Sequence, residues 1–268
     1  LPILQILDEQ LGRIASGNRQ YAYNRTQWRY LLESYLGGED YKRGNHLTRY
    51  QLETDKEYAA RLQTTPLENH CKGVVAVYNS FLFKDCPERN FGSMPADMPE
   101  LTDFLEDCDM EGRNLDAFMK DVSTWASVFG HCWILLCKPN TDAATRADEL
   151  TTGVRPYLSL LSALTVLDWH WERAPAGHYQ LSRFKYIEDI NGSIQTIKEW
   201  TKETITTHEV DYNTRAEIST LIEPNGLGEI PMVLCYHQKS PVRGFGVSAI
   251  QDIAKTQQFI YKIGRAHV

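Results

Sequence analysis

The sequence lacks the short motifs that mark the commonest catalytic and metal-binding sites. It contains no Walker GxxxxGK[ST] phosphate loop, no GxSxG nucleophile turn and no HExxH metalloprotease helix. Its histidines are scattered, and no two of them stand four residues apart with a glutamate between them. We therefore expect no catalytic residues, no cofactor-binding residues, no metal ligands and no cofactor. We interpret the protein as structural, not enzymatic.

Cysteine is sparse, and its spacing suits neither a zinc site nor a redox motif. No CxxC pair occurs, and a zinc site would need more ligands at closer spacing. Only Cys132 and Cys137 lie close together in the sequence, in the apolar run HCWILLC. This usage is typical of buried thiols in a reducing compartment. The cysteines are Cys71, Cys86, Cys108, Cys132, Cys137 and Cys235.

Basic residues are in deficit. The 28 Lys and Arg residues are outnumbered by 35 Asp and Glu residues, which gives a net charge of −7. Such a surface does not attract DNA or anionic lipid by neutralising phosphates. The acidic balance leaves open a protein that lets DNA pass without holding it.

Long hydrophobic runs and a signal sequence are also missing. The longest uncharged stretch, Val122–Cys137, is shorter than the roughly 20 residues that a membrane-spanning helix needs. Asp8 and Glu9 interrupt the apolar N-terminal stretch where the core of a signal peptide would continue. We expect a soluble intracellular chain that contacts no membrane. Because no initiator Met is present, we expect the natural start to lie upstream.

The last six residues, IGRAHV at 263–268, are the translation of ATC GGA AGA GCA CAC GTC. That string resembles the end of a common sequencing adaptor. We interpret residues 263–268 as an artefact that does not belong to the natural fold. The natural protein is then expected to continue beyond this point.

The first half of the chain has helical periodicity. Apolar residues recur at intervals of three and four in residues 4–14, 67–82 and 115–129. Gly130 is the expected C-cap of the last of these helices. Residues 35–47, with two consecutive glycines and mixed charge, are expected to be irregular. The apolar sets are Leu4, Leu7, Leu11 and Ile14; Leu67, Cys71, Val74, Val75, Tyr78 and Leu82; and Leu115, Phe118, Met119, Val122, Trp125, Ala126 and Phe129.

Capping sequences predict where two of the helices begin. Thr54 with Glu57 has the spacing of a capping box, in which each side chain bonds the other residue's backbone N–H. Thr65, Pro66 and Glu68 form a second such signal, with proline at the first helical position. We expect Thr65 to cap the helix that follows it.

After Gly130 the pattern changes from helix to strand. HCWILLCK is expected to be a buried strand that ends at Pro139, and residues 139–154 an exposed linker. Asn191-Gly192 between two alternating runs is the strongest hairpin signal. Because the runs are joined by turns, we expect an antiparallel meander and not βαβ units. The runs are YLSLL (157–161), LTVLDWHWE (164–172), YQLSRFKYIE (179–188), IQTIKEW (194–200), TITTHEV (204–210), AEISTLIE (216–223) and MVLCYH (232–237).

The expected fold class is α+β: a helical N-terminal half, an antiparallel β-rich region and a truncated C-terminal helix. Residues 1–138 form the mainly helical part and residues 139–246 the β-rich part. Residues 247–262 start a long helix, with Ser248 as its expected N-cap.

Two polar features could be read as sites. Residues 104–114 gather Glu106, Asp107, Asp109 and Glu111, but they lack the 12-residue spacing of an EF-hand, so we interpret them as a solvated acidic loop before a helix. Adventitious binding of a divalent cation is the alternative. His170 lies between two tryptophans and is expected to be a half-buried strand residue, with a base stacked in an apolar slot as the alternative.

The stretch GFGVSA, Gly244–Ala249, has the glycine spacing of a dinucleotide-binding loop. That loop normally joins a strand to a helix inside a parallel sheet, whereas the preceding runs indicate antiparallel strands. We therefore expect Gly244 and Gly246 to let the chain turn tightly into a helix. The alternative is an intracellular nucleotide-binding enzyme that uses Gly244–Ala249.

The order of these segments resembles the portal proteins of tailed bacteriophages over roughly residues 20–262. The resemblance rests on a pattern of segments and not on one diagnostic motif. The segments are an acidic-Tyr-x-x-Arg stretch and the following helix (53–83), a helix, glycine turn and apolar strand (104–139), a strand ending near a Trp (164–172), and an Ile-Pro strand that leads through GFGVS into a helix (225–262).

The resemblance implies the wing region of a portal subunit. Such a subunit is expected to form a homododecameric ring at one capsid vertex, through which double-stranded DNA passes during packaging and ejection without sequence-specific binding. The expected partners are the terminase packaging motor, the capsid and the tail-connector proteins. The expected location is the virion, and the host cytoplasm during assembly. A closed ring requires that each subunit use two different faces.

Overall fold

The computed structural model describes residues 19–93, 98–138, 145, 148, 152–214 and 216–263. The fold is α+β, with helices and antiparallel sheets, as the sequence predicts. The chain forms two compact units. The first contains Ser162–Pro231 and the chain up to Tyr30, and the second contains Leu31–Leu161 and the chain from Met232.

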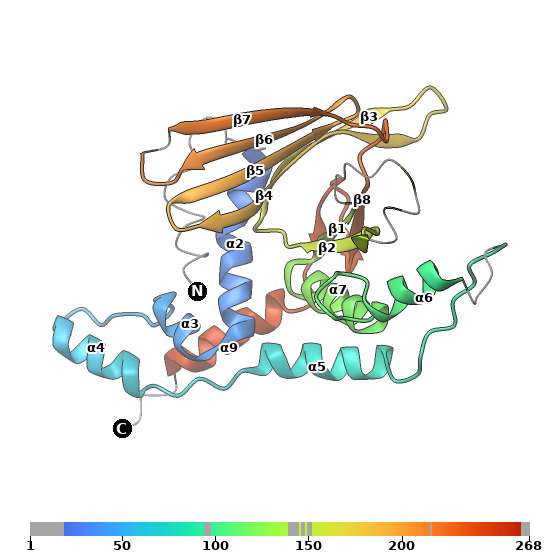
Figure 1. The fold of residues 1–268 in the computed structure, drawn as a ribbon. Helices are drawn as coiled ribbons and strands as arrows, with labels where there is room; N and C mark the ends of the chain where they lie inside the picture. The colour runs from blue at the N-terminus through green and yellow to red at the C-terminus, as the bar shows by residue number, and fades with distance from the viewer. Residues whose placement is uncertain are drawn as a thin grey trace. The chain divides into compact units, whose positions relative to one another are not determined.

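The first unit is built on a five-stranded antiparallel sheet (Figure 1). Its strand order is β3-β4-β5-β6-β7, so each strand pairs with its neighbour in the sequence and the predicted meander is confirmed for five of its seven runs. The prediction is wrong for 157–161 and 232–237, which lie in the other sheet on either side of the strand that starts at His131. Gly192, with φ of 61°, turns the chain between two of the strands, as the hairpin signal predicts. The strands are β3 (Val166–Arg173), β4 (Tyr179–Asn191), β5 (Ile194–Thr201), β6 (Thr204–Asp211) and β7 (Glu217–Pro224).

Aromatic residues from adjacent strands form the centre of this sheet. Trp169 on β3 lies opposite Phe184 on β4, which lies opposite Trp200 on β5, and all three are buried. Helix α2 (Arg19–Leu36) contributes its first part to the unit, where the Arg25 guanidinium donates to the carbonyl of Leu164 over 3.3 Å.

The second unit joins helices to a three-stranded sheet (Figure 1). The sheet order is β2-β1-β8, so that β1 pairs with the strand that follows it and with one about a hundred residues further along. The late strand β8 therefore belongs with the helical half of the chain and not with the five-stranded sheet. The elements are α3 (Gly38–Arg43), α4 (Asp55–Thr64), α5 (His70–Leu82), α6 (Pro99–Glu106), α7 (Leu115–Phe129), β1 (His131–Cys137), β2 (Tyr157–Leu161), β8 (Met232–Tyr236), β9 (Gln238–Lys239), β10 (Gly246–Val247) and α9 (Gln251–Ile263).

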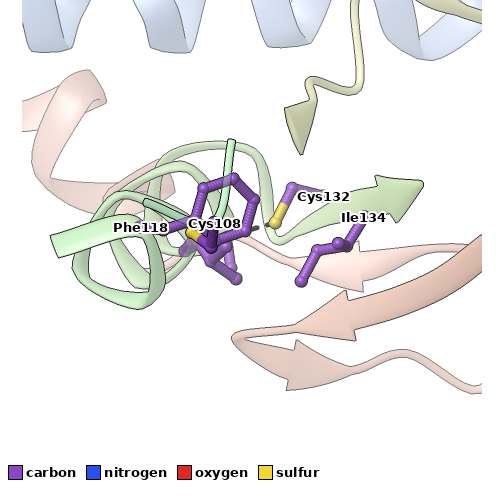
Figure 2. Packing of buried hydrophobic residues seen from close by; sticks show 6 residues of the cluster. Cys108, Phe118, Cys132 and Ile134 are labelled. Atoms are coloured by element: carbon purple, nitrogen blue, oxygen red, sulfur yellow. Dashed lines mark hydrogen bonds between the residues drawn. The ribbon is translucent and has the colours of Figure 1, made fainter. Parts of the chain in front are cut away.

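Helix α7 and strand β1 form the core of this unit. Phe118, Val122 and Ala126 face one way at helical spacing and pack with Cys108, Cys132 and Ile134 (Figure 2). Gly130 ends α7 in the left-handed conformation, with φ of 89°, as the sequence predicts. The predicted capping box of Thr54 and Glu57 at the start of α4 is also confirmed.

The predicted start of α5 is wrong. Thr65 does not cap the following helix. It ends α4, and its hydroxyl donates to the carbonyl of Arg61 over 2.7 Å. Residues 65–69 have no regular secondary structure, and the Asn69 side chain caps α5 by accepting from the backbone N–H of Lys72. The Thr-Pro-x-Glu signal fails because the threonine hydroxyl already has a partner in the preceding helix.

The predicted buried face of α5 is only half right. Cys71 and Val75 are buried, but Val74, Tyr78 and Leu82 are exposed, and the third buried position is Asn79. Asn79 Nδ2 donates to Thr124 Oγ1, and Asn79 Oδ1 accepts from Ser123 Oγ, both on α7. The packed stripe of α5 is narrow and partly polar, which the apolar periodicity did not predict.

Two other boundaries differ from the sequence-based prediction. Residues 35–47, expected to be irregular, contain α3, in which Tyr41 is fully buried. Helix α9 begins at Gln251, several residues after the predicted start at 247. The predicted apolar set of residues 4–14, most of the 139–154 linker and residues 264–268 lie outside the described residues. Within the described part of the chain, no helix is long and apolar enough to cross a membrane.

Candidate functional site

The glycines of Gly244–Ala249 serve a backbone contact with the end of α7. A Cβ on Gly246 would overlap the carbonyl oxygen of Gly130, and a Cβ on Gly130 would lie 2.5 Å from the carbonyl oxygen of Gly246. Two chain segments more than a hundred residues apart thus touch through their main chains. Gly130 must also adopt a left-handed φ, so glycine is required there for two reasons.

Ser248 and Ala249 satisfy carbonyl groups in the last turn of α7. Ser248 Oγ donates to the carbonyl of Val128 over 2.7 Å, and the Ala249 N–H donates to the carbonyl of Ser127 over 2.9 Å. The last carbonyls of a helix have no partner within the helix, so this loop completes the hydrogen bonding of α7. Ser248 also accepts from the N–H of Ile250 over 3.2 Å, just before α9 begins. It therefore links α7 to the start of α9.

Two histidines lie in this junction, which we call the Gly130–Gly246 junction and define as Ser127–His131, His237 and Gly246–Ala249. His131 is fully buried, and burial lowers its pKa to about 4, so it is neutral near pH 7. Its Nδ1 accepts from the Gly246 N–H over 3.4 Å. The His237 N–H donates to the Gly130 carbonyl over 2.9 Å, and its Nδ1 lies 3.2 Å from Ser127 Oγ. Burial also lowers the pKa of His237.

The loop does not offer the donors that a pyrophosphate needs. The N–H of Gly244 donates to the Tyr236 hydroxyl, that of Phe245 to the Val242 carbonyl, and that of Gly246 to His131. A phosphate-binding loop instead presents its backbone N–H groups to the ligand. The strand pairs that the structure describes are antiparallel, whereas the dinucleotide fingerprint belongs to a parallel sheet.

A buried glutamine joins α9 to two other helices of the second unit. Gln257 is 1% exposed, and its Oε1 accepts from the backbone N–H groups of His70 and Cys71 at the start of α5, over 2.9 and 3.2 Å. Its Nε2 donates to the Ser34 carbonyl on α2 over 3.1 Å. One side chain thus satisfies helix-terminal groups from segments far apart in the sequence.

The acidic loop after α6 is organised by an arginine and by its own backbone. Asp109 is buried rather than solvated, and it accepts from the N–H of Glu111 and from Arg113 Nε. Arg113 Nη1 also donates to Asp121 Oδ2 over 2.8 Å. These donors hold the pKa of Asp109 below its usual range although burial opposes them. In the described ranges, no group of three or more His, Cys, Asp or Glu side chains could hold a metal ion.

In the acidic-Tyr-x-x-Arg stretch, Arg61 of α4 binds residues of the segment that precedes this helix. Arg61 binds Glu53 with two hydrogen bonds, Nε to Oε1 over 2.6 Å and Nη2 to Oε2 over 2.7 Å. Its guanidinium lies 4.4 Å from the centre of the Tyr50 ring and 5.5 Å from that of Tyr58. The Tyr58 hydroxyl donates to the Leu47 carbonyl. The pattern that carries the resemblance here is thus explained by packing of the segment on itself.

The structure also locates His170 and the cysteines, which the sequence analysis singled out. His170 lies on β3, as predicted, but is exposed and not half-buried. All six cysteines are free thiols, and Cys71, Cys108 and Cys132 are buried. Cys132 lies opposite Cys235 on β8. The pairing of Cys132 with Cys235 had no signal in the sequence, because it depends on strands far apart in the chain.

No family model matches this chain, and no curated protein matches it either.

Proposed function

We propose that this chain is the wing-region part of a tailed-bacteriophage portal protein. In this proposal it is a structural subunit of a homododecameric ring at one capsid vertex. The ring conducts double-stranded DNA during packaging and ejection, and it docks the terminase motor and then the tail connector. The protein catalyses no reaction and is found in the virion, after assembly in the host cytoplasm.

The observation that carries the proposal is that three of the segments resembling portal proteins meet in the second unit, which contains 53–83, 104–139 and the part of 225–262 from Met232 onward. Segments 104–139 and 225–262 join at the Gly130–Gly246 junction. Segment 53–83 joins them through Gln257, which binds the start of α5. The three segments were matched to portal proteins by sequence alone, and yet they are joined by buried hydrogen bonds in the fold. Their contacts therefore support the interpretation that they belong to one structural module.

Exposed apolar residues supply surfaces that a ring subunit would bury against its neighbours. On α5, Val77 and Phe81 are 57% and 77% exposed, and on β7 Leu221 and Ile222 are exposed as well. A cyclic ring needs two different faces on each subunit, and these residues come from different units of the chain. The net charge of −7 suits a conduit, because a wall that neutralised phosphates would retain DNA.

The experiment is negative-stain electron microscopy of the gene product extended by its natural C-terminal continuation in place of residues 263–268. Rings with a central hole are the expected result. A monodisperse small particle with no hole would overturn the proposal. Phe81→Asp should reduce the fraction of rings, whereas Tyr23→Asp, at another exposed aromatic residue, is the matched control.

The same preparation tests the alternative of a nucleotide-binding enzyme. Since the N–H groups of Gly244–Gly246 are already bonded, we expect isothermal titration with NAD or ATP to give no heat of binding. Stoichiometric binding that Gly244→Ala abolishes would favour the enzyme.

A further inference from the structure

Two cysteines that are far apart in the sequence face each other across strands β1 and β8. Cys132 is the register partner of Cys235 in this antiparallel pair. The His237 N–H bonds the carbonyl of Gly130, its own register partner, so these two residues form a hydrogen-bonded pair. Such pairs alternate along the ladder, which makes Cys132 and Cys235 a hydrogen-bonded pair with Cα atoms about 5.5 Å apart. That Cα separation lies within the range of disulfides, and the bond closes if the Cβ atoms, about 5.5 Å apart in such a pair, move about 1 Å closer.

The two side chains contact each other on the same side of the sheet. The Cys132 thiol donates to the Val122 carbonyl over 3.5 Å, and Cys235 packs against the cluster that contains Cys132. The interaction between the two thiols lowers the pKa of Cys235 and raises that of Cys132. Cys132 is buried in the cluster with Phe118 and Ile134, as Figure 2 shows. Cys235 is only partly buried. Of the two sulfurs, Cys235 is therefore both the more accessible and the more easily ionised.

We propose that Cys132 and Cys235 form a dithiol site that small-molecule disulfides oxidise to an intramolecular disulfide. The Cys235 thiolate attacks one sulfur of a disulfide RSSR, which forms Cys235–S–S–R and releases RS⁻. Cys132 then loses its proton and attacks the Cys235 sulfur, which forms the Cys132–Cys235 bond and releases the second RS⁻. The protein loses two protons and two electrons, and RSSR becomes two RSH.

The bond would close a long loop of the chain. The segment between Cys132 and Cys235 contains strands β2 to β7. Cross-linking the ends of so long a segment restricts the unfolded chain strongly, so the oxidised protein should unfold at higher denaturant concentration. This inference does not require the portal proposal. If both hold, the bond would form once the particle leaves the reducing cytoplasm.

The experiment treats the reduced chain, under native conditions, with a series of reduced and oxidised glutathione mixtures. Remaining thiols are alkylated, and peptides are mapped by mass spectrometry. We expect one Cys132–Cys235 linkage, with Cys71 and Cys108 still alkylatable after denaturation. The oxidised form should have a higher urea midpoint than the reduced form.

Variants separate this pair from nonspecific oxidation. Cys235→Ser should leave Cys132 as a thiol, because no attacking sulfur remains, whereas Cys137→Ser on the same strand should leave the linkage intact. Since Cys132→Ser could prevent folding, the mapping of the unmodified chain carries the test. Any of four results would overturn the proposal. Both cysteines could remain thiols, or they could stop at stable mixed disulfides with glutathione. Cys132 could instead bond Cys108, or the Cys132–Cys235 bond could form only in urea.

Discussion

Each of the two units is stabilised by its own internal contacts, and these contacts differ in kind between the units. In the sheet β3–β7, each strand pairs with the next strand in the sequence, and short turns join the strands. In the second unit, the decisive contacts join residues far apart: Ser248 to Val128 across 120 residues and Gln257 to Ser34 across 223. The sheet can form from local hairpins, whereas the second unit requires distant segments to meet. Buried polar groups and glycine contacts therefore matter more in the second unit.

The largest loss of stability is expected from Gly246→Ala, which disrupts the main-chain contact between Gly246 and Gly130 in the second unit. The new Cβ would overlap the Gly130 carbonyl oxygen, and neither main chain can move away without losing the bonds that cap α7. We expect the free energy of unfolding to fall by about 3–5 kcal/mol. Hydrogen exchange measured by mass spectrometry should show lost protection in α7 and β1 while the β3–β7 sheet stays protected.

Gly226→Ala is the matched control for that substitution. Like Gly246, Gly226 does not have a positive φ, but no atom lies within 4 Å of the position of its Cβ. We expect this variant to change the free energy of unfolding by less than about 1 kcal/mol. Equal losses from the two variants would show that the contact between Gly130 and Gly246 contributes nothing to stability.

The second effect in size is a loss of stability of the same junction in acid. The His131 pKa is about 4 in the folded protein and about 6.5 in an unfolded chain, so the unfolded state binds a proton first as the pH falls. Stability is full above pH 6.5 and decreases down to about pH 4. At about 1.4 kcal/mol per pH unit, the loss approaches about 3 kcal/mol. Urea midpoints between pH 7 and 4 measure it, and His237 adds a contribution of the same sign.

His131→Asn tests the assignment, since its side-chain oxygen can accept from the Gly246 N–H but does not titrate in this range. We expect a flatter pH profile in this variant. His170→Asn, at an exposed position on β3, should leave the profile unchanged. A profile that is equally steep in His131→Asn would assign the acid sensitivity to other groups.

The difference between the units also explains what could be predicted from the sequence. The strands of the meander, the hairpin at Gly192, the cap at Gly130 and the capping box at Thr54 were predicted correctly. Each of these depends on residues close together in the chain: period-two alternation, a glycine at a turn, or a threonine three residues before a glutamate.

The features that could not be predicted depend on distant partners. Thr65 matched the pattern of a cap, but the carbonyl of Arg61 uses its hydroxyl. Only the folded chain shows that Gly246 lies against Gly130, and that Cys132 faces Cys235 and not Cys137. Spacing along the chain contains no information on any of these pairs.

A third, smaller effect is expected where one side chain joins three helices. Gln257→Leu keeps the volume of the side chain but leaves the N–H groups of His70 and Cys71 and the carbonyl of Ser34 without this partner. We expect a loss of about 2–3 kcal/mol, measured by urea unfolding, because buried groups then lack hydrogen bonds. Gln258→Leu, one residue along α9 and less buried, should cost less than about 1 kcal/mol. A Gln257→Leu variant as stable as the control would mean that these backbone groups find other partners.

The smallest effect distinguishes Thr54, which caps α4, from Thr65, which does not cap α5. Thr54→Ala removes the hydroxyl that accepts from the Glu57 N–H at the start of α4, which should cost about 1 kcal/mol. Because no residue of α4 is buried, the loss should appear as faster amide exchange within α4 and not as unfolding of the unit. Thr65→Ala should loosen only the end of α4, where its hydroxyl bonds Arg61. If it instead accelerated exchange at the start of α5, Thr65 and not Asn69 would cap that helix, and the local sequence signal would have been sufficient after all.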